Sequence, residues 1–371
     1  MAFVAPGATN GYLPVATGQV IAFVRKPKHF KTLNSIVQYT PSDLPTGVYA
    51  RLDRDNGVRI SNEDQFVWAD GADMPSAAYF TSRFTTGDFT TVRRAYPWQV
   101  GAQAERNARL WKPKLTHMME AISLCLTLRT KRLIRLLETA GTWAGNTASA
   151  TSLGGGKWNA GTVAAPYFKN GLLRAAAVIN TATNGIIEIN DLVCVLNRDD
   201  VVGSGATAGI AAAPEILDFM KGSVWTQQML TDPFAKVNMQ WGLPDRYQGV
   251  KLVVSTEPQV NEVMNQTGVE ATTNRGLIKS SGSAIICCQP GTMDNELSEK
   301  SYSTVQIFHY AGVKAQSEGR DQGETKNGGA GLLEVKGKYD EWNEKWLGAV
   351  VEQTGEKVAA PMSGYLVTAI I

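Results

Sequence analysis

The sequence has very few of the residues from which catalytic and metal centres are built. It contains only three histidines in 371 residues, His29, His117 and His309. They lie far apart, and neither an HExxH nor a CxxC spacing occurs, so no zinc site is expected. With three dispersed histidines and no G-x-S-x-G segment, the chain also offers few bases for a serine or cysteine nucleophile. No cofactor is expected.

The four cysteines do not form a pattern typical of a disulfide framework. Each lies within an apolar run of the sequence. If "AIICC" is a strand, the adjacent Cys287 and Cys288 point to opposite faces, which disfavours a shared ligand site. Reduced, buried thiols in a cytoplasmic product are therefore expected for Cys125, Cys194, Cys287 and Cys288.

Charge of one sign and long hydrophobic runs are also missing. The 36 Lys and Arg balance the 34 Asp and Glu, so bulk charge identifies no partner. No apolar run approaches the roughly 18 residues that span a bilayer. The N-terminus lacks the cationic start and apolar core of a signal peptide. A soluble protein without a membrane partner is expected.

The glycine-rich segment 154–157, "GGGK", resembles a phosphate-binding loop but lacks its other residues. A Walker motif needs a glycine five residues before Gly156 and a hydroxyl residue after the lysine. Thr151 and Trp158 occupy these positions, and the segment follows a helix instead of a strand. A flexible connection is predicted here.

A second glycine cluster, "VVGSGATAG", does not fit a dinucleotide fingerprint. Its third glycine, Gly209, comes one position too late, and "NRDD" separates the preceding strand from the glycines. This segment is predicted to be a loop.

Residues 102–140 give the strongest helical pattern. At 100° per residue, with Arg129 as zero, eight apolar residues fall within an arc of roughly 100°. They are Leu115, Met118, Met119, Ile122, Leu126, Leu133, Leu136 and Leu137. Lys131, Arg132, Arg135 and Glu138 are predicted on the other side. Pro113 predicts a kink or a fresh helix start, and the helix is expected to end near Gly141.

An α/β pattern follows the long helix. Helices are predicted in "APYFKNGLLRAAAVIN" and "AAPEILDFMKGS", and strands in "LVCVLNRD", "QGVKLVVS", "SAIICCQ" and "STVQIFHYAG". The closing segment from Leu332 is strand-like, with one tight turn predicted at Thr354-Gly355.

The N-terminal hundred residues contain extended segments that cannot bury themselves. Residues 1–46 form an arm that is expected to lie against another part of the chain or a neighbour. In residues 47–100, Asn56-Gly57 between alternating segments predicts a β-hairpin with a type I′ turn. A second extended region follows, with a turn signal at Thr86-Gly87-Asp88. A long two-stranded excursion of this kind has no core of its own.

The order of these elements resembles the major capsid protein of tailed bacteriophages, the Hong Kong 97-type fold. The order is arm, hairpin, long helix, α/β section and closing strands, with "TASATSLGGGKW" and "KVAAPMSGYLVTAI" as local similarities. The resemblance implies an α+β fold. Its parts would be an N-arm (1–46), an E-loop (47–100), a P-domain with the spine helix (101–185), an α/β A-domain (186–329) and closing P-domain strands (330–371).

The resemblance also implies a function without an active site. The chain would assemble as hexamers and pentamers into an icosahedral shell around double-stranded DNA. Portal, scaffolding and decoration proteins would be its partners, and the virion, assembled in the host cytoplasm, its location. Segment 102–140 carries eight Lys and Arg against three Asp and Glu, so Lys131, Arg132 and Arg135 are candidates for facing the packaged polyanion.

Contacts between subunits are expected from the E-loop. The candidates are Asp53, Arg54, Asn56, Gly57, Arg59 and Trp68. Residues 47–100 contain no lysine, so the Lys–Asn cross-link of some relatives is not expected. Because no long acidic segment precedes the arm, scaffolding is expected to be a separate protein or to have been removed.

Two other readings stay open. An encapsulin-like shell would package enzymes instead of DNA, although such chains are usually shorter. A soluble α/β enzyme with a β-rich extension would form a small oligomer with a ligand-dependent melting temperature.

Overall fold

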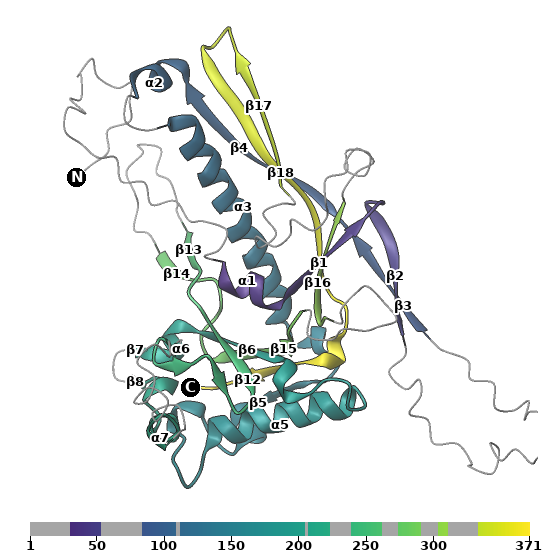
Figure 1. Cartoon of the computed structure of the whole chain (residues 1–371), viewed down its shortest axis with the longest axis vertical. Coiled ribbons are helices and arrows are strands. Elements are labelled where there is room, and N and C mark those ends of the chain that lie inside the picture. The colour runs from purple at the N-terminus through teal and green to yellow at the C-terminus, as the bar shows by residue number, and fades with distance from the viewer. Residues whose placement is uncertain are drawn as a thin grey trace, which may run out of the picture.

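The computed structural model describes residues 30–52, 84–108, 112–204, 207–222, 239–261, 274–290, 303–310 and 333–371. These residues form a mixed α+β protein with two principal sheets. One sheet lies in a compact lobe at one end of the long axis (Figure 1). The other is drawn out into a long hairpin at the opposite end. In the described chain, no helix is long and apolar enough to cross a membrane.

The lobe is built on a six-stranded sheet. In spatial order its strands are β11 (Arg246–Tyr247), β12 (Val250–Ser255), β6 (Leu192–Asn197), β15 (Ser283–Cys288), β19 (Gly364–Thr368) and β5 (Thr147–Ser149). β12 is parallel to β6, whereas β15 runs antiparallel to both β6 and β19. All six residues of β6 are buried, as expected for a strand covered on both faces.

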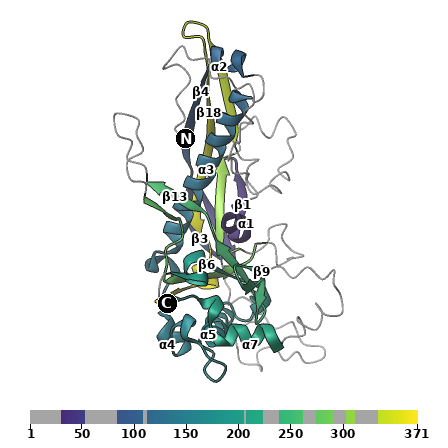
Figure 2. The ribbon, with the colours of Figure 1, turned by 90° about the vertical axis from the view of Figure 1, so that its left-hand side faces the viewer.

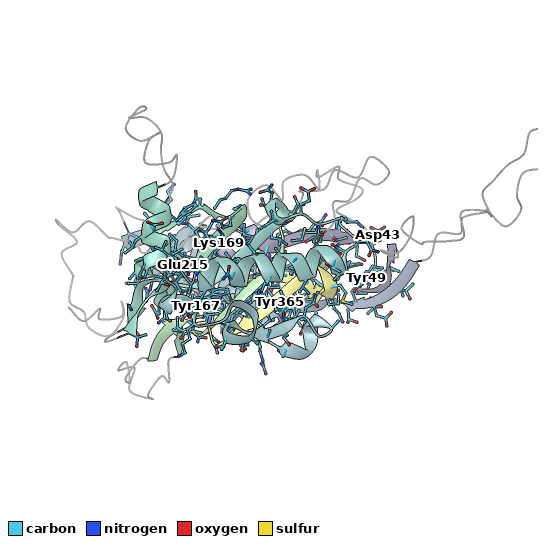
Figure 3. The ribbon with its side chains drawn as sticks, turned by 90° about the horizontal axis from the view of Figure 1, so that it is seen from below. Asp43, Tyr49, Tyr167, Lys169, Glu215 and Tyr365 are labelled. Atoms are coloured by element: carbon cyan, nitrogen blue, oxygen red, sulfur yellow. The ribbon has the colours of Figure 1, made fainter. Side chains whose placement is uncertain are left out.

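Helices cover one face of this sheet (Figure 3). They are α4 (Ala150–Gly154), α5 (Tyr167–Ala182), α6 (Arg198–Val202) and α7 (Pro214–Gly222). Phe168, Leu172 and Ile179 of α5 pack with Leu196 and Ile286 in one hydrophobic cluster. The helices and strands predicted for this section are confirmed to within a few residues.

The opposite face of the sheet packs against the end of the long helix α3 (Pro113–Leu137) and the short helix α1 (Lys31–Ile36). Cys287 belongs to this cluster and Cys288 to the cluster under α5. The prediction that these two cysteines point to opposite faces is therefore confirmed. All four cysteines are buried thiols.

The second sheet is drawn out along α3 (Figure 2). Its strands are β1 (Val37–Ser42), β16 (Val305–Tyr310), β18 (Lys345–Val358) and β17 (Glu334–Asp340), with β4 (Val92–Gly101) also paired to β18. β18 pairs with β17 as far as Val351 and with β16 from Thr354 onward, while β4 follows its other edge from Lys345 to Thr354. β18 therefore joins the two ends of the molecule.

The remaining strands form short two-stranded sheets. They are β2 (Thr46–Leu52) with β3 (Phe84–Thr90), β7 (Gly203–Ser204) with β8 (Thr207–Ala208), β9 (Met239–Gln240) with β10 (Leu243–Pro244), and β13 (Pro258–Asn261) with β14 (Asn274–Leu277). Helix α2 (Ala102–Asn107) follows β4. The 3₁₀ turns are η4 (Ala140–Trp143), η5 (Trp158–Ala160), η6 (Ile189–Asp191), η7 (Ile210–Ala212) and η10 (Pro361–Ser363).

The long helix begins afresh at Pro113, as predicted, with the proline at its first position. Leu126, Leu133 and Leu137 are buried as expected, but Leu115 is half exposed. The predicted stripe is thus only partly correct, because α3 packs on the lobe near its C-terminal end and on β4 and β18 near its N-terminal end. These two partners bury different sides of the helix.

Glycine signals for turns and flexibility are wrong at three positions. Gly87 lies inside β3, and Gly355 lies inside β18. A Cβ at Gly355 would lie 2.3 Å from the carbonyl oxygen of Thr90. The loop at 154–157 is closely packed, since a Cβ at Gly156 would lie 2.5 Å from the Tyr167 ring. These glycines are required by close neighbours, not by a turn or a flexible connection.

Candidate functional site

The β2–β3 ribbon is the first of two projections from the body. Its strands pair from Thr46↔Thr90 to Leu52↔Phe84, and it leaves the second sheet beside β1 and β16 (Figure 1). The predicted E-loop contact residues lie between these strands, outside the described residues. They are Asp53, Arg54, Asn56, Gly57, Arg59 and Trp68. The hairpin predicted at Asn56-Gly57 stays a prediction.

The root of the ribbon carries exposed apolar side chains. Leu44 and Val48 are each 63% exposed, and Val92, where β4 begins, is about half exposed. Thr91 donates its backbone N–H to the carbonyl of Pro45 at 2.8 Å, which holds the two connections of the ribbon together. A two-stranded ribbon cannot bury such residues against itself. Only another molecule, or another segment of the chain, can cover them.

The β17–β18 hairpin is the second projection, and it ends in an ordered turn. Asp340 accepts hydrogen bonds from the backbone and the side-chain amide of Asn343, at 3.3 and 2.8 Å. The Glu344 carbonyl accepts from the backbone N–H of Ala102 at 2.8 Å, which joins the turn to α2. The turn is therefore fixed on both sides.

Trp342 lies in this turn and is 94% exposed. The hairpin tip is at the far end of the long axis from α5 (Figures 1 and 2). A buried tryptophan supplies one of the largest apolar contributions to an interface. Trp342 is thus an exposed apolar side chain carried on an ordered turn, with no described neighbour to cover it.

The part of β18 that follows the turn is packed against a tryptophan of β4. Trp98 of β4 covers Gly348, where a Cβ would lie 2.2 Å from the indole ring. Lys114 at the start of α3 places its Nζ 3.5 Å from the centre of the Trp346 ring. The β18 strand of the hairpin is therefore packed against both β4 and α3 at these positions.

A buried ion cluster joins the middle of α3 to β18. Arg129 Nε and Nη2 donate to Oε2 of Glu352 at 2.9 and 2.7 Å, and both side chains are 0% exposed. Tyr96 Oη and Arg132 Nη2 donate to Oε1 at 2.8 and 2.7 Å. Arg132 also pairs with Glu356 at 2.8 Å. Every oxygen of the Glu352 carboxylate is satisfied.

The cluster strongly favours the charged form of Glu352. Burial alone would raise the pKa of this carboxyl, but Arg129 and Arg132, with the Tyr96 hydrogen bond, lower it to about 2. Nearby, burial and the positive charge of Arg129 lower the pKa of His309 to about 4. The charged state of Glu352 therefore depends on tertiary contacts between β18, β4 and α3.

The structure separates the three predicted polyanion-facing residues. Lys131 and Arg135 are exposed on α3. Arg132 is instead mostly buried in the ion cluster, where it pairs with Glu352. Glu138 forms an ion pair with the buried Lys279 at 3.0 Å. The prediction that Arg132 and Glu138 lie on the open side is wrong, since partners from β18 and from the turn before β15 cover them.

Arg129 was missed by the sequence reasoning, although the pattern contained a signal for it. It lies inside the angular arc of the apolar stripe, so a helix packed on that side must bury its guanidinium. A buried arginine requires an acidic partner. Which of the 34 Asp and Glu residues it would be could not be read from the sequence.

Comparisons with known proteins agree with this architecture. No protein-family model and no curated protein matches the sequence. Among solved structures, the capsid of Ralstonia phage GP4 matches 100% of this chain and 97% of its own, with 10% identity and a TM-score of 0.51. The chain has the fold of a phage capsid protein. A phage-related protein from Bordetella bronchiseptica matches 93% of this chain and 96% of its own, with 11% identity and a TM-score of 0.52. In the described part of this fold, both projections carry exposed apolar side chains, Val48 on the ribbon and Trp342 on the hairpin.

Proposed function

We propose that this chain is the major capsid protein of a tailed phage, which assembles into a closed icosahedral shell around double-stranded DNA. The observation that carries the proposal is the match to a phage capsid over the full length of both chains. A match of both chains from end to end supports a common architecture better than a match to one shared lobe. The proposed role is structural: the chain assembles into a shell and catalyses no reaction.

The parts of the Hong Kong 97-type fold can be assigned on this basis. α3 is the spine helix, and β4, β17 and β18 with it make the P-domain. The lobe around β6, β12 and β15 is the A-domain, and the β2–β3 ribbon is the base of the E-loop. The N-arm enters through α1 and β1. This assignment differs from the domain limits inferred from the sequence in one respect, because it moves β4 (Val92–Gly101) from the E-loop to the P-domain.

The exposed apolar groups support assembly physically. Leu44, Val48 and Trp342 lie at the two projections, and the described residues of the chain leave them exposed. Around Trp342, acidic Asp340, Glu341 and Glu344 lie between basic Lys338 and Lys345 in the sequence. Mixed signs on one surface allow identical copies to meet without net repulsion.

Shell formation implies further partners. Copies of the chain would form hexamers and pentamers, with portal, scaffolding and decoration proteins as additional contacts, and assembly would take place in the host cytoplasm before packaging into the virion. Lys131 and Arg135 are exposed cations available to packaged DNA. A non-specific contact of this kind should weaken steeply as salt is raised.

Electron microscopy and sedimentation of the purified protein test the proposal. Closed shells that run as one monomer band after boiling and reduction are expected, because residues 47–100 lack a cross-linking lysine. A small oligomer would refute the shell and favour an α/β enzyme. Shells that carry protein cargo and no DNA when purified from infected cells would favour an encapsulin-like compartment.

A matched pair of tryptophan variants tests the hairpin tip. Trp342→Ser should raise the protein concentration needed for assembly by at least tenfold, while its unfolding midpoint stays at the wild-type value. Trp241, which is 52% exposed in the β9–β10 turn, is the control position, and Trp241→Ser should have a smaller effect. Equal effects of the two substitutions would contradict a specific role for the tip.

A further inference from the structure

The β2–β3 ribbon is attached to the body by three stacked aromatic rings. Phe89 of β3 stacks on Phe308 of β16 with ring centres 4.2 Å apart and planes at 10°. Tyr49 of β2 lies 5.3 Å from the same ring, at 28°. We call Tyr49, Phe89 and Phe308 the aromatic clasp. In Figure 3, Tyr49 and Asp43 are labelled at the side from which the ribbon departs.

The clasp is a local contact, separate from the main core. None of its rings belongs to the three hydrophobic clusters of the described residues. Phe89 and Phe308 are nevertheless buried. The Phe89 ring lies over Gly47 of β2 and stacks on Phe308 of the body, so contact with the body supplies part of its burial. The clasp is therefore what keeps one face of the ribbon against the sheet.

Glycines on both strands of the ribbon make space for the rings. Gly47 lies opposite Phe89, and Gly87 lies opposite Tyr49. A Cβ would lie 2.8 Å from the Phe89 ring at Gly47 and 2.5 Å from the Tyr49 ring at Gly87. Any side chain at either position would displace a ring that contacts Phe308. The two glycines and the three rings are thus one arrangement.

The connections of the ribbon are short and sit directly beside the clasp. Residues 43–45 join β1 to β2, and Thr91 alone joins β3 to β4. Thr91 Oγ1 donates to the Pro45 carbonyl at 2.8 Å and accepts from Gln353 Nε2 at 3.2 Å. These bonds locate the point at which the ribbon joins the second sheet. The stacked rings oppose a tilt of the ribbon about this point, because tilting would separate their faces.

We propose that the aromatic clasp fixes the angle at which the ribbon leaves the subunit, and that Phe308 is the positioning residue that sets this angle. This rests on the proposed shell function. In a closed shell, the angle of a projecting arm determines where it meets the next copy, and so it determines curvature. A loosened clasp would then alter particle size without unfolding the subunit.

Two variants and two matched controls test this. Phe308→Leu keeps an apolar side chain but removes the flat ring, and Gly87→Ala disturbs Tyr49 without touching Phe308. The controls are Phe219→Leu, in an aromatic group of the lobe, and Gly141→Ala, where a Cβ meets nothing within 4 Å. Hydrogen exchange is measured over residues 43–52 and 84–91 in the same assembly state, and particle diameter is measured by electron microscopy.

The clasp variants should exchange these segments at least tenfold faster than wild type and should give particles of mixed diameter or open sheets. The controls should keep wild-type exchange and a single diameter. Wild-type exchange and diameter in both clasp variants would overturn the proposal. If wild type itself forms no shells, the proposed function fails, while the exchange measurement still decides whether the clasp holds the ribbon.

Discussion

Replacing Arg129 by methionine should strongly destabilise the subunit. Arg129 and Glu352 are both inaccessible to solvent, and Arg129 supplies the two hydrogen bonds that satisfy Oε2 of the glutamate. Without them, Tyr96 and Arg132 still bind Oε1, but a buried carboxylate oxygen is left without donors. Removing one partner of a buried ion pair costs about 3 to 5 kcal/mol. A loss in this range is expected for Arg129→Met.

The pKa of Glu352 gives an independent magnitude. Its folded value of about 2 lies below the ordinary 4.5, so the charged form is bound more tightly in the folded state. At about 1.4 kcal/mol per pKa unit, the cluster contributes about 3 kcal/mol above pH 4.5. This contribution is lost as the pH falls from 4.5 towards 2. In Arg129→Met, the loss of stability over this range should be smaller.

Urea unfolding followed by circular dichroism, at matched assembly state, measures these effects. The control is Arg135→Met, on the exposed side of the same helix, which should change stability by less than about 0.5 kcal/mol. Arg129→Met combined with Glu352→Leu should regain much of the stability, because no buried charge is left without its main partner. The reasoning is refuted if Arg129→Met costs no more than Arg135→Met, or if the double variant is less stable than Arg129→Met alone.

Three further predictions concern other parts of the molecule. His309 has a folded pKa of about 4 against the ordinary 6.5, so folding favours its neutral form and stability is lost as the pH falls from 6.5 to 4. His309→Gln should flatten this part of a curve of melting temperature against pH, and an unchanged slope would contradict the burial of His309. Leu126→Asp would place an unpaired charge at a fully buried position and should leave little soluble protein, whereas normal assembly of this variant would count against the packing of α3. Replacing residues 53–83 by a short Gly/Ser linker should keep a cooperative melt but abolish fast-sedimenting particles, and persistence of closed shells would exclude an E-loop role for this segment.

The sequence by itself determined most of the local elements. Pro113 fixes the start of α3 because its ring fits only the first turn of a helix. The unbroken apolar run of β6 and the alternation of Cys287 and Cys288 followed from strand geometry. These features depend on residues within a few positions of one another, so the pattern of side chains was sufficient. The order of the elements also carried the resemblance to the phage-capsid fold.

The tertiary structure alone decided what the glycines do. A glycine in sequence reads as a turn, yet Gly87 makes room for Tyr49, Gly156 for Tyr167 and Gly355 for the backbone of Thr90. The residues that require this space are up to 265 positions away along the chain, as for Thr90 and Gly355. No local pattern records such a neighbour.

The same holds for the charges. The helical pattern placed Arg132 on the open side, and it did not identify Arg129 as a buried cation. Their partner Glu352 is more than 200 residues later in the chain, on a strand whose register with β4 and β16 is set by pairing along its whole length. Whether a charged side chain is solvated or buried depends on which surface reaches it. For Arg129 and Arg132, the surface is that of β18, and it reaches α3 only in the folded chain.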